Sequence, residues 1–220
     1  MPFTFPDALY PIADAADARD VLALAAAILA GGARFLQLRA KDASTGELLR
    51  LARAAKALTD GAGARLIVND RADVARLVDA AGVHLGQDDL PPAAARAILG
   101  PEKVIGFSTH NLDQVDAALH TGAIDYLAFG PIFATASKRN PDPPQGCDAV
   151  RIVRPRCALP LVAIGGIDGA NLHDVLAAGA DAVAVIGAIA STPDPARATR
   201  ALLTAVRSAP RPPTARPSSA

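Results

Sequence analysis

The feature that most constrains this chain is a regular alternation between two kinds of segment. One kind is short, rich in Val, Ile and Leu, and lacks the alternating polar residues of a half-exposed strand. The other is Ala-rich, mostly longer, and has the spacing of a helix. Strands without polar alternation are buried on both faces, and helices between successive strands imply parallel pairing. The predicted strands are 9–13, 34–38, 65–68, 83–85, 103–107, 126–129, 161–164 and 182–186, and the predicted helices are 18–30, 45–59, 74–79, 92–99, 112–120, 148–155, 171–177 and 195–208.

Eight strand–helix units predict an α/β fold, a single closed (β/α)8 TIM barrel. The length of 220 residues agrees, because one such barrel takes roughly 200–250 residues. An open doubly wound sheet is the alternative, but its Gly-x-Gly-x-x-Gly turn after the first strand is missing. Ser44, Asn111 and Asp194 are predicted to cap helices. We expect one barrel domain over residues 1–208 and a disordered Pro- and Ser-rich tail over residues 209–220.

The charge balance argues against polyanionic partners. Lys plus Arg and Asp plus Glu number 22 each, so no overall field attracts nucleic acid or an anionic membrane. The apolar run 21–30 is shorter than the roughly 20 residues that span a bilayer, and the first ten residues do not resemble a signal peptide. Cys147 and Cys157 match no metal motif and are expected as free thiols in a reducing compartment. We expect a cytoplasmic protein with small-molecule substrates; a homo-oligomer is compatible with the sequence.

Polar residues gather at the carboxyl ends of the predicted strands, where the active sites of such barrels lie. Gln37, Arg39 and Lys41 alternate at the end of the second strand, so their side chains point to one side. Two cations and an amide in this arrangement suit a phosphate or pyrophosphate group. A salt-bridged barrel interior is the alternative interpretation.

One carboxylate lies at the end of the third predicted strand, and another follows the fourth. Asp70 and Asp89 are predicted as Mg2+ ligands beside the basic cluster, with the metal bridging to pyrophosphate oxygens. The alternatives are structural: Asp70 would pair with Arg71, and Asp89 would cap the helix that follows Pro91.

Glycines follow the last two strands, at the usual phosphate position of this fold. Gly165-Gly166 and Gly187 would let backbone N–H groups meet an anion at a helix N-terminus, although plain tight turns are the alternative. The irregular segment 134–146 is expected to be functional, because loops of this length are uncommon in compact domains. Its closure over the site is a hypothesis.

The histidines show no zinc spacing. His84, within the fourth strand, is expected to be a hydrogen-bonded residue of the barrel, and His110 is a candidate ligand contact. Ser108 has no evident His–Asp relay in the sequence. We therefore interpret it as a hydrogen-bonding partner of a ligand rather than as a nucleophile.

Together these blocks resemble the thiamine phosphate synthase family. They follow the family's order from about residue 9 to residue 190, which is nearly the whole predicted barrel. The blocks are Leu9-Tyr10, Gln37-x-Arg39-x-Lys41, Asn69-Asp70-Arg71, Gly82-Val83-His84-Leu85-Gly86-Gln87-Asp88-Asp89-Leu90, Gly106-Phe107-Ser108-Thr109-His110, Asp125-Tyr126, Gly130-Pro131-Ile132-Phe133-x-Thr135-x-Ser137-Lys138 and Ala163-Ile164-Gly165-Gly166-Ile167. The resemblance implies that a hydroxymethylpyrimidine pyrophosphate and a thiazole phosphate condense to thiamine phosphate, releasing pyrophosphate.

The resemblance also implies roles, position by position. Asp70 and Asp89 would hold Mg2+, and the catalytic residues would be Lys138, Arg39 and Ser108. The substrate-binding residues would be Gln37, Arg39, Lys41, Asn69, Ser108, Thr135, Ser137, Lys138, Gly166, Ile186 and Gly187.

Three positions depart from the family's pattern. Ala40 stands where Glu is common, Ser137 where Thr is usual, and Gly187 where Ser is common. The last change loses one side-chain bond to the thiazole phosphate. A thiazole tautomerase of the same barrel group and a non-catalytic binder of thiamine precursors are the alternatives, and the complete set of metal and pyrophosphate residues argues against both.

Overall fold

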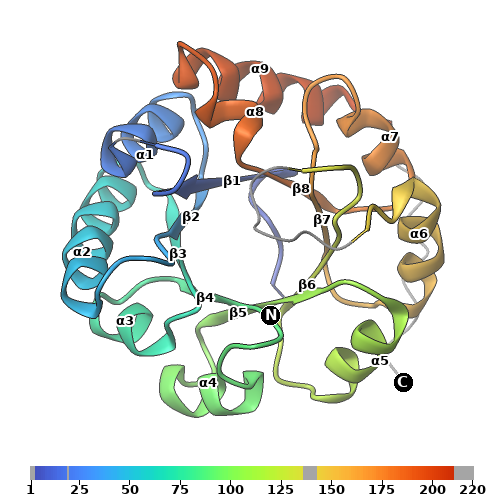
Figure 1. Cartoon of the computed structure of the whole chain (residues 1–220), viewed down its shortest axis with the longest axis horizontal. Helices are drawn as coiled ribbons and strands as arrows, with labels where there is room; N and C mark the ends of the chain where they lie inside the picture. The colour runs from blue at the N-terminus through green and yellow to red at the C-terminus, as the bar shows by residue number, and fades with distance from the viewer. Residues whose placement is uncertain (1–2, 19, 136–142, 211–220) are drawn as a thin grey trace.

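Eight parallel strands close into a barrel inside a ring of helices (Figure 1). The computed structural model describes residues 3–18, 20–135 and 143–210. The strands pair in sequence order, and β8 returns to pair with β1, Leu9 lying opposite Val183. This closure confirms the predicted (β/α)8 barrel and excludes the open doubly wound sheet.

The strands are β1 (Leu9–Asp14), β2 (Phe35–Arg39), β3 (Arg65–Asn69), β4 (Gly82–Leu85), β5 (Val104–Thr109), β6 (Tyr126–Phe129), β7 (Leu161–Ile164) and β8 (Ala182–Val185). The helices are α1 (Val21–Ala30), α2 (Thr45–Gly61), α3 (Ala72–Leu77), α4 (Pro92–Leu99), α5 (Leu112–His120), α6 (Gly146–Val153), α7 (Leu172–Ala177), α8 (Gly187–Ala190) and α9 (Pro195–Ser208), with a 3-10 turn, η1 (Arg154–Arg156), after α6.

Helix starts follow the capping residues. The predicted caps are confirmed, because the side chains of Ser44, Asn111 and Asp194 each accept a hydrogen bond from a backbone N–H of the first turn. The helix predicted from residue 18 begins only at Val21, since the Asp20 carboxylate accepts from the N–H groups of residues 22 and 23. Helix α8 was not predicted, because four residues after a strand carry no periodic pattern.

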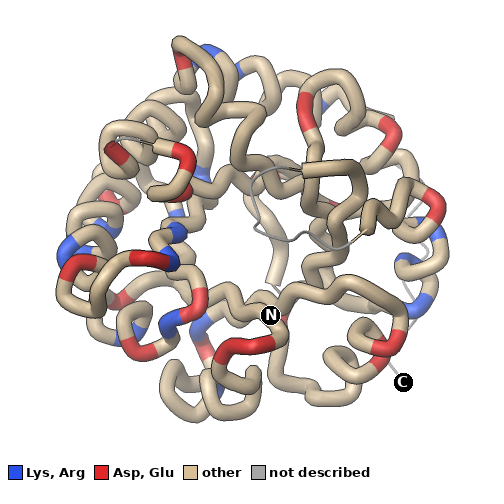
Figure 2. Tube along the Cα trace, in the orientation of Figure 1, with Lys and Arg blue, Asp and Glu red and all other residues tan. Residues whose placement is uncertain are grey.

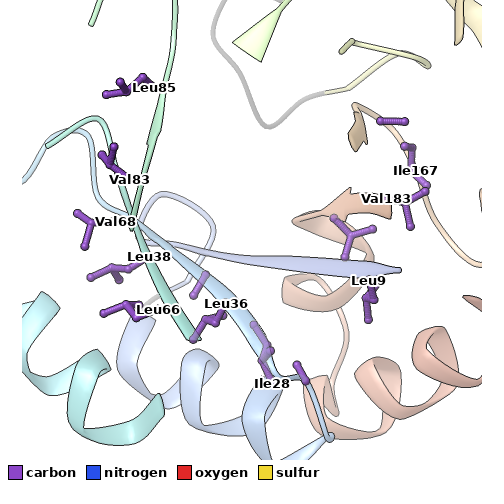
Figure 3. Close-up of a cluster of buried hydrophobic side chains, with 14 of the residues drawn as sticks. Leu9, Ile28, Leu36, Leu38, Leu66, Val68, Val83, Leu85, Ile167 and Val183 are labelled. Carbon is purple, nitrogen blue, oxygen red and sulfur yellow. The ribbon is translucent and has the colours of Figure 1, made fainter. Parts of the chain in front are cut away.

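Strand residues alternate between two cores. One set packs outward against the helices, and Figure 3 shows Leu36 and Leu38 of β2 beside Leu66, Val68 and Val83 of the next two strands. The other set fills the barrel interior. It comprises Tyr10, Ile12, Phe35, Ile67, Val104, Tyr126, Ala128, Val162, Ala182 and Ala184.

The segment before β1 closes the amino-terminal end of the interior. The ring centroid of Phe5 lies 5.1 Å from that of Phe35 and 5.2 Å from that of Tyr126, and Phe3 lies 5.7 Å from both. Edge-to-face and tilted contacts of this kind are favourable for aromatic rings. The polar opening of the interior is therefore at the carboxyl ends of the strands.

Both cysteines are present as thiols, as predicted. Within the described ranges, no helix combines the length and the apolar character that crossing a membrane requires. The tail beyond residue 210 and most of the segment 134–146 lie outside the described residues.

An arginine clamp at the amino-terminal face joins β7 and β8. The guanidinium of Arg154 donates to the Asp181 carboxylate at 2.7 Å and to the carbonyls of Cys157 and Leu159. Asp181 in turn accepts from the N–H of Leu161, the first residue of β7. The clamp is largely buried, with side-chain exposures of 15% for Arg154 and 18% for Asp181.

Arg154→Met is expected to lower the free energy of unfolding by about 3 kcal/mol, because it leaves a partly buried carboxylate and two carbonyls without their guanidinium donor. Urea unfolding measures this change. Arg151→Met is the matched control, since Arg151 pairs with an Asp148 side chain that is 91% exposed, and such pairs contribute at most about 1 kcal/mol. Equal losses in both variants would contradict the clamp.

Candidate active site

Charged residues converge at the carboxyl ends of β2, β3 and β4 (Figure 2). Lys41 follows β2, and its Nζ lies 3.3 Å from Oδ2 of Asp70, which follows β3. Asn69 ends β3 and is 9% exposed. The barrel therefore brings the predicted pyrophosphate and metal residues of neighbouring strands to one edge.

Arg39 is held by an acid that the sequence analysis missed. Its guanidinium donates to the carboxylate of Asp14, the last residue of β1, which is 1% exposed. The predicted first strand stopped at residue 13, so this strand-end carboxylate was not recognised. For Arg39 the alternative interpretation, a salt bridge in the barrel interior, therefore holds. Lys41 differs, because its side chain is 51% exposed.

Gln37 lies deeper than the other two members of its motif. It is 2% exposed, and its amide Nε2 donates to the hydroxyl of Tyr10 at 2.7 Å. Gln37 and Arg39 alternate on β2 and so point to the same side of the strand, whereas Lys41 lies beyond the end of the strand. The amide nitrogen of Gln37 therefore has a protein partner inside the barrel.

Asp70 and Asp89 form a pair of interacting carboxyls. Burial, together with the hydrogen bond and charge of Asp89, raises the pKa of Asp70 from 3.8 to about 6, against the lowering effect of Lys41. Asp70 adopts a left-handed φ of 64°, a conformation that few non-glycine residues take but that Asp and Asn take more readily than most. Two interacting carboxyls, one of which has a strongly perturbed pKa, are typical of ligand sites.

Neither structural alternative for these two acids fits. Arg71 pairs with Asp73 at 2.6 Å instead of with Asp70. The residue at the N-cap of α4 is Pro91, and the carboxylate of Asp89 accepts from the N–H of Gly86 within the loop. Asp70 therefore pairs with Lys41 rather than with Arg71, and Asp89 bonds within its own loop rather than capping α4.

The acid pair fits a hard divalent cation. Among the described residues no group of three or more His, Cys, Asp or Glu side chains is placed to hold a metal. Two carboxylates are nevertheless the usual protein share of a Mg2+ site that is completed by water and substrate phosphates. A cation would also offset the two effects that raise the pKa of Asp70, which are burial and the neighbouring Asp89.

The glycine turn after β7 has a packing reason. Gly165 and Gly166 have φ values of 102° and 61°. A Cβ on Gly165 would lie 2.5 Å from the Cβ of Pro131, and one on Gly166 would lie 2.4 Å from the carbonyl oxygen of Ala134. The tight-turn alternative thus accounts for why these two residues are glycines, and it is compatible with a phosphate site.

Gly187 differs from the other glycines of the mouth. It is the first residue of α8, after Ile186 at the N-cap. A Cβ there would meet only the Ser191 hydroxyl, at 3.7 Å. Unlike Gly165 and Gly166, this position has room for a side chain.

Ser108 has a histidine partner that the sequence alone did not reveal. Nε2 of His84 lies 2.8 Å from the Ser108 hydroxyl, and Nδ1 lies 2.8 Å from the hydroxyl of Tyr126. The signal was missed because residues 84 and 108 meet only when β4 pairs with β5. His84 is the hydrogen-bonded barrel histidine that was expected.

This pair is not a nucleophile and base. Burial lowers the pKa of His84 to about 4, with a smaller opposing effect of Asp89. The third member is a tyrosine hydroxyl rather than the carboxylate that stabilises the imidazolium of a serine hydrolase. The interpretation of Ser108 as a hydrogen-bonding partner of a ligand is therefore retained.

The remaining candidates are His110, which follows β5, and three residues of the segment after β6. Nδ1 of His110 donates to the carbonyl of Gly130 at 2.7 Å, so this ring helps to fix the start of the loop. Thr135 is half-buried at the end of the described stretch. Ser137 and Lys138 lie outside the described residues.

A (β/α)8 barrel with cations and paired carboxylates at β2–β4 and a glycine turn at β7 is typical of a phosphate-handling enzyme. Residues 9–189 match the thiamine monophosphate synthase family model. The thiamine-phosphate synthase of Chloroflexus aurantiacus is 46% identical over 196 residues, 88% of this chain and 90% of its own length. That of Moorella thermoacetica is 47% identical over 184 residues, 84% and 87% of the two chains.

A solved structure agrees with these relatives. Thiamine phosphate pyrophosphorylase from Pyrococcus furiosus has a TM-score of 0.82 and 35% identity, covering 90% of this chain and 95% of its own. The chain belongs to the thiamine monophosphate synthase family.

Asp70→Asn is expected to stabilise the metal-free protein by about 1 kcal/mol near pH 7.5. The raised pKa means that the Asp70 charge opposes folding above about pH 6, and this penalty vanishes below about pH 4, where both states are protonated. Asparagine tolerates the left-handed φ. Urea unfolding without divalent cations at both pH values measures the difference.

Asp73→Asn is the matched control, because Arg71 lowers the pKa of Asp73 and its charge favours folding. The control should therefore be slightly destabilised near pH 7.5. A loss of stability in Asp70→Asn at that pH would contradict the interacting acid pair.

Proposed function

We propose that this chain is a thiamine phosphate synthase, a transferase that joins 4-amino-2-methyl-5-hydroxymethylpyrimidine pyrophosphate to 4-methyl-5-(2-phosphoethyl)thiazole. The observation that carries the proposal is the Asp70–Asp89 pair beside Lys41, in a chain of this family. A family member that only bound precursors would have no need of an acid pair whose own repulsion costs stability.

The β2–β4 side of the mouth suits the pyrophosphate. Asp70 and Asp89 would hold Mg2+, and Asn69 would lie beside them on the pyrimidine substrate. When bound, the metal would stabilise negative charge on the leaving pyrophosphate. Lys41 and Arg39 would bind pyrophosphate oxygens, and Asp14 holds the Arg39 guanidinium in place before substrate arrives.

The reaction needs no covalent bond to the protein. The bond between the pyrimidine methylene and the pyrophosphate oxygen breaks, and its electron pair leaves with pyrophosphate. The ring-stabilised cation is then attacked by the lone pair of the thiazole nitrogen. Lys138 would reach the leaving group, while Ser108, Thr135 and Ser137 would line the two ring pockets. The low pKa of His84 agrees with this scheme, because no base is required.

The β7–β8 side suits the monophosphate of the thiazole. Gly166 and Gly187 would offer backbone N–H groups, and Ile186 would contact the ligand beside them. The cytoplasmic location expected from the sequence remains part of the proposal. The tautomerase and the non-catalytic binder gain no support, because the named relatives are synthases.

Pyrophosphate release tests the proposal directly. Wild-type protein given both substrates should release pyrophosphate with Mg2+ and stop with EDTA. Asp70→Ala and Lys138→Ala should each lower kcat/KM by at least about a hundredfold, since each removes a charge that acts on the leaving group. Arg71→Ala, which removes an exposed cation paired with Asp73, should retain activity. Wild-type protein that binds thiazole phosphate but releases no pyrophosphate would refute the synthase proposal.

Gly187→Ser is expected to improve binding of the thiazole phosphate by several-fold. The position is open, and a hydroxyl at the start of α8 adds one hydrogen-bond donor to a charged group, worth about 1 kcal/mol or more. KM for the thiazole substrate measures the change, with kcat unaffected. Gly187→Ala is the control that adds Cβ without the donor, and an equal gain in both variants would exclude a hydrogen bond.

A further inference from the structure

A chain of hydrogen bonds crosses the barrel interior and ends at Ser108. From Gln37, Nε2 donates to the Tyr10 hydroxyl at 2.7 Å, and the Tyr10 and Tyr126 hydroxyls lie 2.9 Å apart. The Tyr126 hydroxyl lies 2.8 Å from Nδ1 of His84, whose Nε2 lies 2.8 Å from the Ser108 hydroxyl. The chain therefore connects β2, β1, β6, β4 and β5.

The fold makes room for this chain. Tyr10 and Tyr126 are at most 1% exposed, and His84 is 8% exposed. Gly106 of β5 lies against the ring of Tyr126, where a Cβ would be 1.9 Å from Cζ. The rings of His84 and Tyr126 are stacked at 5.6 Å. Most TIM barrels fill this space with branched apolar side chains, so a polar chain here calls for a reason beyond packing.

The direction of the chain follows from its first donor. An amide NH2 group can only donate, so the Tyr10 oxygen accepts from Gln37 and its own proton goes to Tyr126. Tyr126 then donates to Nδ1 of His84. His84 is neutral, because burial disfavours the imidazolium and lowers its pKa to about 4. Its one proton is therefore on Nε2 and is donated to Ser108.

We infer that Tyr126 and Tyr10 are positioning residues, which fix the Nε2–H tautomer of His84 and thereby turn the Ser108 hydroxyl proton outward as a hydrogen-bond donor to the substrate. The oxygen of Ser108 already accepts from His84, and its single proton needs another acceptor. A ring nitrogen of a pyrimidine is such an acceptor, whereas an exocyclic amino group is not. This assignment rests on the proposed function for the identity of the ring.

In the competing arrangement, every hydrogen bond between Gln37 and Ser108 is donated in the opposite direction. It requires the Gln37 amide to present its oxygen to Tyr10 and His84 to carry its proton on Nδ1, so that Ser108 donates inward. Ser108 would then meet the substrate as an acceptor. The two arrangements differ in one observable, the tautomer of His84.

NMR of protein with 15N-labelled histidine reads this tautomer without substrate. The ring signals of His84 are assigned by their loss in His84→Asn. A protonated Nε2 and an unprotonated, hydrogen-bonded Nδ1 in the wild type are expected. A proton on Nδ1 would overturn the inference, whether or not the synthase proposal holds.

Kinetics test the positioning role. Tyr126→Phe removes only a hydroxyl, should leave His84 as a mixture of tautomers, and should lower kcat about tenfold, the effect of one hydrogen bond. KM for the thiazole substrate should not change. Tyr10→Phe, one step further along the chain, should have a smaller effect in the same direction.

Phe35→Leu is the matched control. The Phe35 ring lies 4.8 Å from that of Tyr10, so this variant loosens the same aromatic cluster without removing a hydroxyl. It should lose stability and keep both the tautomer and kcat. An unchanged tautomer and kcat in Tyr126→Phe, or a kcat loss in Phe35→Leu as large as that in Tyr126→Phe, would show that the tyrosines only pack. If the wild type releases no pyrophosphate, the synthase proposal fails while the tautomer measurement still decides the direction of the chain.

Discussion

In the closed barrel every strand side chain points either outward to the helices or inward to the barrel interior, and both environments are buried. The rest of the structure depends on this division. Residues that face the helices can be apolar without exception, as Leu36, Leu66 and Val83 are. Residues that face inward pack at the closed end and turn polar towards the mouth, where β1 passes from Tyr10 to Asp14 and β2 from Phe35 to Arg39. A polar group placed there must find a partner, because water cannot reach the interior freely.

Two levels of polar structure satisfy this requirement in different ways. In the interior, neutral groups pair with one another from Gln37 to Ser108, and the chain has a direction. At the mouth, Asp14 neutralises Arg39. Lys41 only partly offsets the effects of burial and of Asp89, which raise the pKa of Asp70. The first arrangement is complete in the protein except for the hydroxyl proton of Ser108, which is left for the substrate. The second becomes complete only with a cation and an anion, which is the expected property of a site that binds both.

The fold could be predicted from the sequence because most strands and helices are marked by local sequence patterns. Buried apolar runs, N-caps such as Ser44 and Asn111, and glycine turns need no knowledge of distant contacts. What could not be predicted depends on register between strands. Asp14 lies one residue beyond a boundary that apolar pattern cannot fix, and the meeting of His84 with Ser108 needs the pairing of β4 with β5. Helix α8 was missed because it is too short to show a period.

The two sides of the mouth differ in how they could hold a phosphate, and the difference matches the two proposed substrates. A diphosphate that departs during the reaction gains charge at the oxygen that was bonded to the methylene. Groups with full charge, such as Lys41 and a metal held by Asp70 and Asp89, would therefore act most strongly where charge develops. A monophosphate that only anchors a substrate keeps its charge throughout. Backbone N–H groups around Gly166 and Gly187 would suffice for it, since uniform binding adds nothing to kcat. Strong charges concentrated at β2–β4 and glycines at β7–β8 would therefore assign the chemistry to one side of the mouth and the anchoring to the other.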